Sequence, residues 1–378
     1  MCFGTVMMDG LLMIPGPVKL HERIINAMAR QMIGHRSKDF EEVFEYCINA
    51  LKPLFGTKSD VVIISGSGTA GMEAAVASFS KVKRVTCIDN GKFGERFAKI
   101  ASRYTEVDHI RFEWGTSIDL EKVEESIAEG SEAVTFVHNE TSTGILNPAK
   151  EIAKIAHKYD ALVIMDGITS VGGDEVKMDE WGIDVAVVGS QKCIGAPPGL
   201  AAVAISDRAW DHYNERVPYY LDLKAYVKKA EENQTPYTPA VPLFLALAEA
   251  LKIIEEEGLE NRIKRHRKFS KAVRAWCESA GLELFPKLNE VSAYSNTVTA
   301  IRMPKNVTDK ELRETLQREY GITISGGQEH LKGKIFRIGT MGNITKRDVL
   351  ATLAAIEDIL LRKNAIKPAI HIAMEVLK

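Results

Sequence analysis

The middle of the chain alternates short apolar runs with stretches of helical periodicity. Several runs are rich in Val and Ile without strict alternation, which is typical of strands that are buried on both faces. We predict strands at Val61–Ile64, Arg84–Ile88, Val107–Phe112, Ala133–His138, Ala161–Met165, Val185–Gly189 and Ala201–Ile205. We predict helices at about 20–31 and 39–54, and at Ala70–Phe79, Leu120–Glu129 and Lys150–Lys158. This alternation predicts an α/β fold around a mostly parallel, seven-stranded sheet.

The pattern changes after about residue 256. A long charged helix is followed by a strand at Thr297–Arg302, a helix at 308–319, short strands at 322–325 and 335–338, and a helix at about 345–362. This predicts a smaller α+β domain. We therefore expect an extended arm over 1–18, a large domain over 19–255, a small domain over 256–364 and a tail over 365–378. The tail has apolar residues at helical spacing, and it could pack on the body, pack on a partner or be frayed.

Length and composition narrow the class of protein. A chain of 378 residues usually forms two domains, and 45% hydrophobic with 26% charged residues is ordinary for a globular protein. With a net charge of −2, the chain lacks the excess of basic residues that is typical of nucleic-acid-binding proteins. No apolar run is long enough to span a membrane. Residues 1–18 contain no Lys or Arg, unlike a signal peptide. The five cysteines are scattered without metal-ligand spacing, so we expect a cytoplasmic protein with reduced thiols and no metal site.

Three short motifs follow predicted strands. Ser65-Gly66-Ser67-Gly68-Thr69 opens a helix, where free N–H groups and the helix dipole suit a phosphate. It is neither a Walker loop nor a full dinucleotide fingerprint, and alone it is more typical of a structural turn than of a phosphate site. Asp166 closes a strand, where its carboxylate could cap a helix, bind a metal or hold a protonated ring nitrogen. Lys192 follows the next strand, and an amine with a depressed pKa there would be a nucleophile toward aldehydes.

The order of these motifs is more informative than any one of them. An anion cradle, a carboxylate for a pyridinium nitrogen and a Schiff-base lysine are the three groups that pyridoxal phosphate requires. All three come where an α/β sheet presents its ligands. The combination predicts a pyridoxal-phosphate enzyme.

The chain resembles the class V aminotransferases, the alanine–glyoxylate and serine–pyruvate aminotransferase family of fold type I. The resemblance runs from about Pro15 to about residue 360. It is carried by Pro15-Gly16-Pro17, Gly34-His35-Arg36-Ser37, Ser65-Gly66-Ser67-Gly68-Thr69, Asn90-Gly91-Lys92-Phe93-Gly94-Glu95-Arg96, His138-Asn139-Glu140-Thr141-Ser142-Thr143-Gly144, Ser190-Gln191-Lys192, Ala196-Pro197-Pro198-Gly199, Thr238-Pro239, Glu257-Gly258-Leu259-Glu260-Asn261 and Phe336-Arg337-Ile338-Gly339. Many ordered matches make it specific.

The resemblance implies roles for individual residues. Lys192 is similar to the Schiff-base lysine, and Asp166 to the partner of the pyridine nitrogen. The other implied cofactor ligands are Gly68, Thr69 and Gln191 for the phosphate, Phe93 as the stacking ring and Ser142 near the phenolic oxygen. Arg337 is similar to the clamp for the substrate carboxylate, and Gly16 lies in a loop that is near small substrates in the family. In the family the site lies at a dimer interface, so Thr238 and Tyr237 are expected to reach the phosphate of the other subunit of a homodimer.

The implied reaction moves an amino group between a small L-amino acid (alanine, serine or aspartate) and a 2-oxo acid (glyoxylate or pyruvate) by ping-pong kinetics. Three departures from the family pattern leave the substrate open. Ile14 stands where the family commonly has Gly, Gln328-Glu329-His330 is more polar than usual, and Thr340 replaces a common His. Glu329 and His330 could contact a side-chain carboxylate, or they could be a solvated loop.

Three rivals share the fold. A cysteine desulfurase needs a Cys before the substrate Arg and a His before the lysine, but residues 322–336 contain no Cys and Gln191 precedes Lys192. A lyase or epimerase would use the same lysine and stays open as an alternative. A non-catalytic relative predicts loss of the lysine, the aspartate or the arginine, and this chain has all three.

Overall fold

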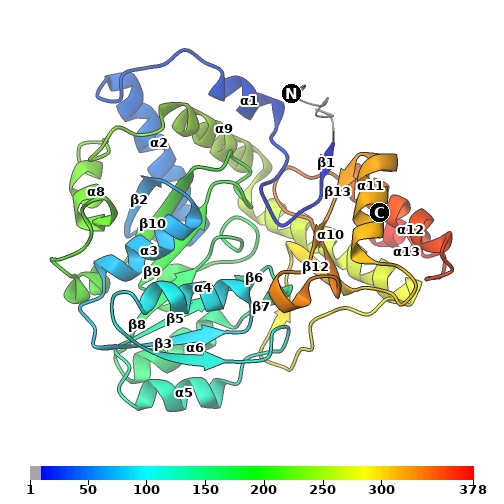
Figure 1. Cartoon of the computed structure of the whole chain (residues 1–378). Coiled ribbons are helices and arrows are strands. Elements are labelled where there is room, and N and C mark those ends of the chain that lie inside the picture. Colours follow the sequence, from blue (N-terminus) through cyan, green and yellow to red (C-terminus); the bar gives the residue numbers. More distant parts are fainter. Residues whose placement is uncertain (1–9) are drawn as a thin grey trace, which may run out of the picture.

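A seven-stranded sheet forms the centre of the computed structural model, which describes residues 10–378. Its strands, in spatial order, are β2 (Asp60–Ser65), β10 (Leu200–Ile205), β9 (Val185–Gly189), β8 (Leu162–Asp166), β5 (Ala133–Val137), β3 (Arg84–Asp89) and β4 (Glu106–Arg111). Only β10 runs antiparallel to its neighbours, because the loop 190–199 that joins it to β9 is too short for a crossover helix. The predicted mostly parallel sheet is confirmed (Figure 1).

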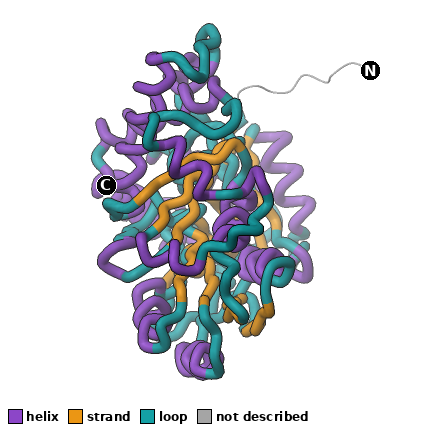
Figure 2. The backbone as a smooth tube through the Cα atoms, turned by 90° about the vertical axis from the view of Figure 1, so that its left-hand side faces the viewer, coloured by secondary structure: helices purple, strands orange, loops and turns teal. Residues whose placement is uncertain are grey.

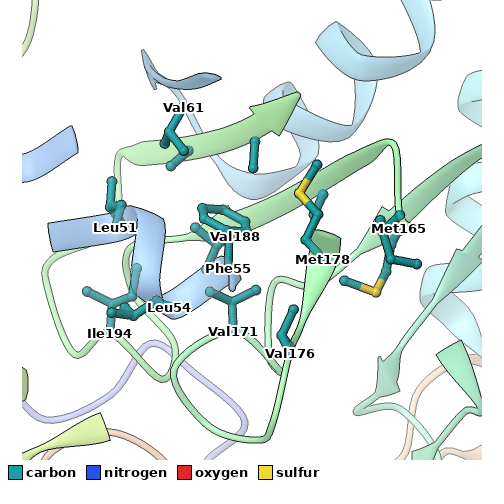
Figure 3. Close-up of a cluster of buried hydrophobic side chains, with 14 of the residues drawn as sticks. Leu51, Leu54, Phe55, Val61, Met165, Val171, Val176, Met178, Val188 and Ile194 are labelled. Carbon is teal, nitrogen blue, oxygen red and sulfur yellow. The ribbon is translucent and has the colours of Figure 1, made fainter. Parts of the chain in front are cut away.

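Helices cover both faces of this sheet, so that the strands lie between two helical layers (Figure 2). One layer contains α2 (Lys38–Phe55), α5 (Leu120–Ala128), α6 (Ala149–Lys158) and α9 (Val241–Glu257), and the other contains α3 (Gly68–Ser78), α4 (Lys92–Ala101) and α8 (Leu223–Ala230). Alternate residues of each strand face opposite layers, since Val188 belongs to the first core and Val187 to the second. Figure 3 shows part of the first core, where α2 packs against β2 and β9.

A second, smaller unit follows in the chain. Its antiparallel sheet has the order β12 (Val298–Arg302), β15 (Ile335–Gly339) and β14 (Ser325–Gly326), and its helices are α10 (Leu259–Ala280), α11 (Asp309–Tyr320), α12 (Lys346–Leu361) and α13 (Ile370–Val376). These elements share a core of their own that is separate from the two cores of the large sheet. The predicted α+β character agrees with this arrangement, while the domain boundaries stay a prediction.

The two ends of the described chain both pack on the small unit. In the tail, Ala373 and Leu377 are buried in the small core, and Glu357 accepts hydrogen bonds from Ala369 N at 2.9 Å and Trp276 Nε1 at 2.8 Å. Of the alternatives left open for the tail, the structure therefore has the one packed on the body. At the other end, β1 (Leu11–Leu12) pairs with β13 (Ile322–Thr323).

Several short elements complete the fold. They are α1 (Glu22–Met28), β6 (Asn139–Glu140), β7 (Ile145–Leu146), α7 (Met178–Trp181), β11 (Ala293–Tyr294) and three 3₁₀ turns at Asp207–His212, Tyr219–Leu221 and Glu329–Leu331. Helix α1 is shorter than the predicted 20–31, because only Ile24 and Ala27 of it are buried and little packing extends it. Within residues 10–378, no helix combines the length and apolar character that a membrane crossing requires. Cys2 lies outside the described residues.

Candidate active site

The predicted site residues meet at the carboxyl edge of the large sheet. A cavity of about 220 Å³ is lined there by residues that follow three different strands, among them Gly68, Thr69, Asp166, Gln191 and Lys192. Parallel strands end at the same edge of a sheet, so motifs that are far apart in the chain become neighbours there. Even the two closest motifs, at Asp166 and Lys192, are 26 residues apart in the chain. This edge is where α/β sheets bind ligands.

The wall formed by helix α3 suits an anion. Its N-cap residue Ser67 makes no side-chain capping bond, and the described residues provide no partner for the N–H groups of Gly68 and Thr69. Arg96 donates from Nη1 to Thr69 Oγ1 at 3.1 Å, which adds a positive charge. Gln191 also lines the cavity, and its buried Oε1 has no hydrogen-bond partner among the described residues. Free N–H groups at a helix N-terminus next to a guanidinium form a phosphate cradle.

Asp166 is a buried carboxylate at the end of β8. Its Oδ1 accepts a hydrogen bond from Ile168 N at 2.8 Å, and no ion pair holds it within residues 10–378. Burial raises the pKa of Asp166 to about 7, and the negative charge of Glu140 adds to the rise, while the Ile168 bond and the positive charges of Lys192 and Arg96 oppose it. A carboxylate in this state favours a ligand that brings a proton or a positive charge to it.

Lys192 faces the same cavity from the loop after β9, and its Nζ donates a hydrogen bond to Pro15 O. Burial lowers the pKa of Lys192 to about 8, and the positive charges of Arg337 and Arg96 contribute to the decrease. Gly16 has φ +93°, and a Cβ at this position would lie 2.5 Å from Lys192 Cδ. The arm residue Gly16 is therefore a glycine both for its backbone conformation and for the space that Lys192 needs.

Phe93 lines the cavity from the start of α4, with Arg96 Cζ 4.8 Å from the centre of its ring. The buried carboxylate of Glu140 accepts hydrogen bonds from the N–H groups of Phe93 at 2.9 Å and Gly94 at 3.1 Å. Burial raises the pKa of Glu140 despite these bonds. Ser142 lies behind this wall, since its Oγ donates to Glu140 at 2.5 Å and accepts from Lys92 N at 2.9 Å. It does not line the cavity.

Arg337 is 5% exposed and lies beside the cavity rather than in its lining. Its Nε and Nη2 donate to Gly326 O at 3.0 and 2.8 Å, and its Nη1 donates to Thr141 O at 2.9 Å. Burial lowers the pKa of Arg337 to about 10, so the guanidinium is charged at neutral pH. A guanidinium has five N–H groups, and these three bonds leave one free on each terminal nitrogen. Two free N–H groups are enough to bind the two oxygens of a carboxylate.

Four other predicted residues lie away from this cavity. Tyr237 donates from its hydroxyl to Tyr219 O at 2.7 Å, and Thr238 is exposed. Glu329 forms an ion pair with Lys92 at 2.7 Å, and the His330 ring lies 4.7 Å from that of Trp114. The side chains of Glu329 and His330 are thus engaged with protein partners rather than with the cavity.

Sequence reasoning assigned no role to several residues that form the site. Arg96 and Glu140 lie inside motifs that carried the resemblance, but nothing in their spacing shows that one reaches Thr69 and the other the start of α4. Asn139 and Thr141 line the cavity where Ser142 was expected, and Asn139 Oδ1 is buried without a partner among the described residues. Strand β6 ends at Glu140, so the turn that follows it, rather than a strand period, sets the positions of Thr141 and Ser142.

The family model for class-V aminotransferases matches residues 19–350. The chain belongs to this family. It is 48% identical over 355 residues to an uncharacterised aminotransferase of Methanocaldococcus jannaschii, covering 92% of this chain and 91% of the relative. It is 38% identical over 360 residues to a protein of Synechococcus sp. named soluble hydrogenase, small subunit, covering 93% and 92%. The name hydrogenase belongs to that relative and not to this chain. Within residues 10–378 of this chain, no group of three or more His, Cys, Asp or Glu is arranged to hold a metal ion.

Among solved structures, the ureidoglycine–glyoxylate aminotransferase of Bacillus subtilis has a TM-score of 0.90 and 34% identity, covering 97% of this chain and 98% of that one. This chain therefore has the fold of type I pyridoxal-phosphate enzymes. It is a transaminase whose cofactor is pyridoxal phosphate. The residues present fit that cofactor. The uncapped N-terminus of α3 suits its phosphate, Asp166 its ring nitrogen, and Lys192 its aldehyde.

Proposed function

We propose that this aminotransferase moves the amino group of alanine, serine or aspartate to glyoxylate or pyruvate. The observation that carries the proposal is the meeting of Lys192, Asp166 and the α3 N-terminus around one cavity. The similarity to a glyoxylate aminotransferase supports glyoxylate as the acceptor.

Six of the residues that line the cavity then have a chemical task. When bound, pyridoxal phosphate supplies an electron sink that stabilises negative charge at the substrate α-carbon. Gly68, Thr69 and Gln191 hold its phosphate, and Phe93 offers a ring face to stack on. The Asp166 carboxylate keeps the ring nitrogen protonated. Lys192 would hold the cofactor aldehyde, and its neutral amine would serve as the general base that takes the proton from the substrate α-carbon.

Arg337 and Gly16 orient the substrate in this proposal. The Gly326 carbonyl already covers the Nε edge of the Arg337 guanidinium, so the α-carboxylate binds the two free N–H groups at its end. Gly16 lies against the Lys192 side chain and leaves no room there for a larger residue.

The visible absorption spectrum of the purified protein tests this function. We expect a cofactor band that is absent in Lys192→Ala and present in the control Lys264→Ala, since Lys264 is an exposed lysine on α10. Alanine, serine, aspartate and glutamate are then added one at a time. A donor that removes the band, followed by its return with glyoxylate or pyruvate, supports the proposal and names half of its specificity. A band that no donor changes would contradict transamination by this chain.

We also propose a homodimer with shared sites, in which Tyr237 and Thr238 reach the phosphate bound by the partner. Thr238 is exposed, and neither residue lines the cavity of its own chain, which supports a role across an interface. Mixing Lys192→Ala with a Tyr237→Phe/Thr238→Ala double variant tests this arrangement. A hybrid dimer would regain one intact site, so activity should rise above that of either variant alone. Absence of any gain after subunit exchange would contradict shared sites.

The cysteines support a reducing, cytoplasmic location. Cys47, Cys87, Cys193 and Cys277 are all free and buried, as expected where thiols are not oxidised. Fluorescence microscopy of the tagged full-length chain in its own cell checks this location. Signal confined to the cell envelope or the medium would contradict it.

A further inference from the structure

Arg262 is a fully buried guanidinium near the start of α10, and none of the roles above uses it. It lies just beyond the motif Glu257-Gly258-Leu259-Glu260-Asn261, which joins α9 to α10. A buried charge is retained only where it is paired and hydrogen-bonded. The partners of Arg262 therefore indicate what it does.

Those partners are the backbone carbonyls that directly follow Lys192. Arg262 donates from Nε and Nη2 to Cys193 O at 3.1 and 2.6 Å, and from Nη2 to Ile194 O at 3.4 Å. Cys193 and Ile194 are the two central residues of a turn, because Lys192 O accepts a hydrogen bond from Gly195 N at 3.0 Å. The guanidinium thus binds both central carbonyls of the turn that begins at Lys192.

Neutral contacts hold the rest of this turn. The Ile194 side chain lies in the first core beside Leu54 of α2 (Figure 3). Cys193 Sγ donates to Thr169 O at 3.1 Å, and Asn343 Nδ2 donates to Gly195 O at 3.3 Å. Arg262 supplies the charged hydrogen bonds to the turn, and charge-assisted bonds are the stronger kind.

A single carboxylate links Arg262 to the substrate side of the site. Glu257 accepts from Arg262 Nη1 at 2.8 Å and from Arg265 Nε at 2.5 Å. Arg265 in turn donates to Gly342 O at 3.1 Å and Ile344 O at 3.0 Å. These two carbonyls belong to the loop that follows β15, the strand that carries Arg337. The cluster therefore ties the lysine turn to the strand of the proposed carboxylate clamp.

We propose that Arg262 is a positioning residue that sets the direction of the Lys192 amine relative to Arg337. This inference rests on the roles proposed above for Lys192 and Arg337. Arg262 touches neither substrate nor cofactor; it acts through the backbone of the lysine turn. A displacement of a reacting group by about 1 Å can cost about 100-fold in rate, so loss of these bonds lowers turnover while the cofactor still binds.

The test compares Arg262→Met with Lys264→Met, both as cofactor-loaded full-length protein. Lys264 lies two residues further along the same helix with its side chain 71% exposed, so its variant controls for a lost cation on α10. Three properties are measured: circular dichroism of the visible cofactor band, the pH midpoint of that band, and kcat and KM for the amino donor. In Arg262→Met we expect an altered dichroism, a shifted midpoint and a kcat lower by about 10- to 100-fold, with KM changed much less. Lys264→Met should match the unmodified protein.

Arg262→Lys keeps the proposal testable if Arg262→Met does not fold. A lysine ammonium retains the charge but cannot bind two carbonyls and Glu257 with the geometry of a guanidinium. We expect an altered dichroism and a shifted midpoint in this variant too, with a smaller loss of kcat of about 3- to 10-fold. A variant at Arg262 with unchanged dichroism, midpoint and kcat per loaded site would overturn the inference, even if its melting temperature fell. If Lys192→Ala also kept the visible band, the proposed function itself would have failed instead.

Discussion

The reactivity of Lys192 toward an aldehyde should exceed that of an ordinary lysine by a calculable factor. Burial lowers the pKa of its amine to about 8 from the usual 10.5, and only the neutral amine is a nucleophile. At about pH 7, roughly one amine in ten is neutral with the lower pKa, against about one in 3,000 with the usual one. We therefore expect the apo-protein to load the cofactor covalently about 300-fold faster at this pH than it would if Lys192 had the usual lysine pKa.

Stopped-flow absorbance of apo-protein mixed with pyridoxal phosphate measures this rate from about pH 6 to about pH 10. The rate should rise with pH and level off around a midpoint of about 8. Arg337→Met removes a positive charge that lowers the pKa of Lys192, so its midpoint should move up. Asp166→Asn removes a negative charge that raises this pKa, so its midpoint should move down. The Asp166 effect should be confined to pH above about 7, where this carboxyl is ionised.

A midpoint near 10.5 would refute the reasoning, because it would mean that burial does not act on the Lys192 amine. A midpoint near 8 that neither variant moves would confirm desolvation as the cause and contradict the contribution of the two charges. Because Asp166 and Lys192 titrate close together, the measured midpoints describe the coupled pair.

Three further outcomes follow from the same geometry. Gly16→Ala should slow cofactor loading by at least about tenfold, because the added methyl group would contact Lys192. The control Gly130→Ala, at φ +104° with open space around it, should only lower the free energy of unfolding in urea by about 1 to 2 kcal/mol. Asp166→Asn should stabilise the apo-protein at pH 8 by up to about 4 kcal/mol, because the raised pKa of Asp166 makes ionisation costly above pH 7, and this gain should vanish as the pH falls toward 4. The matched change Asp184→Asn should instead destabilise the apo-protein by about 3 kcal/mol, since Asp184 pairs with Arg208 at 2.7 Å. If both variants changed the stability in the same direction, the raised pKa of Asp166 would be contradicted. Burial raises the pKa of Cys193 to about 12, so its thiol should react with a disulfide reagent only after unfolding, as peptide mapping would show.

The large sheet could be predicted because its signal is local. Apart from the edge strand β4, which is mostly polar, each strand of this sheet is a short, largely apolar run, and a buried parallel strand requires little else. Helix α2 was equally readable: Ser37 caps its start by accepting from Phe40 N, and Gly56 ends it with φ +65°. The pattern does not mark α9, because α9 is apolar on most of its surface and so lacks an amphipathic period.

The sequence by itself also determined which chemistry the site offers. Glycines before a helix, Asp166 at one strand end and Lys192 after the next supply the three groups that pyridoxal phosphate requires, and parallel topology brings strand ends together. That inference needs only the order of elements and the direction of the strands. It needs no knowledge of how side chains pack.

Only the tertiary structure decided the contacts that tune this chemistry. Glu140 reaches the start of α4 from 46 or more residues away in the chain, and Arg262 reaches the carbonyl of Cys193 across 69 residues. Ser142, which the resemblance places near the cofactor, does not line the cavity, and its hydroxyl donates to Glu140. Periodicity reports which face of an element is buried, whereas a polar contact depends on the distance and direction between two elements. Those quantities are set by packing of the whole chain, so no local pattern contains them.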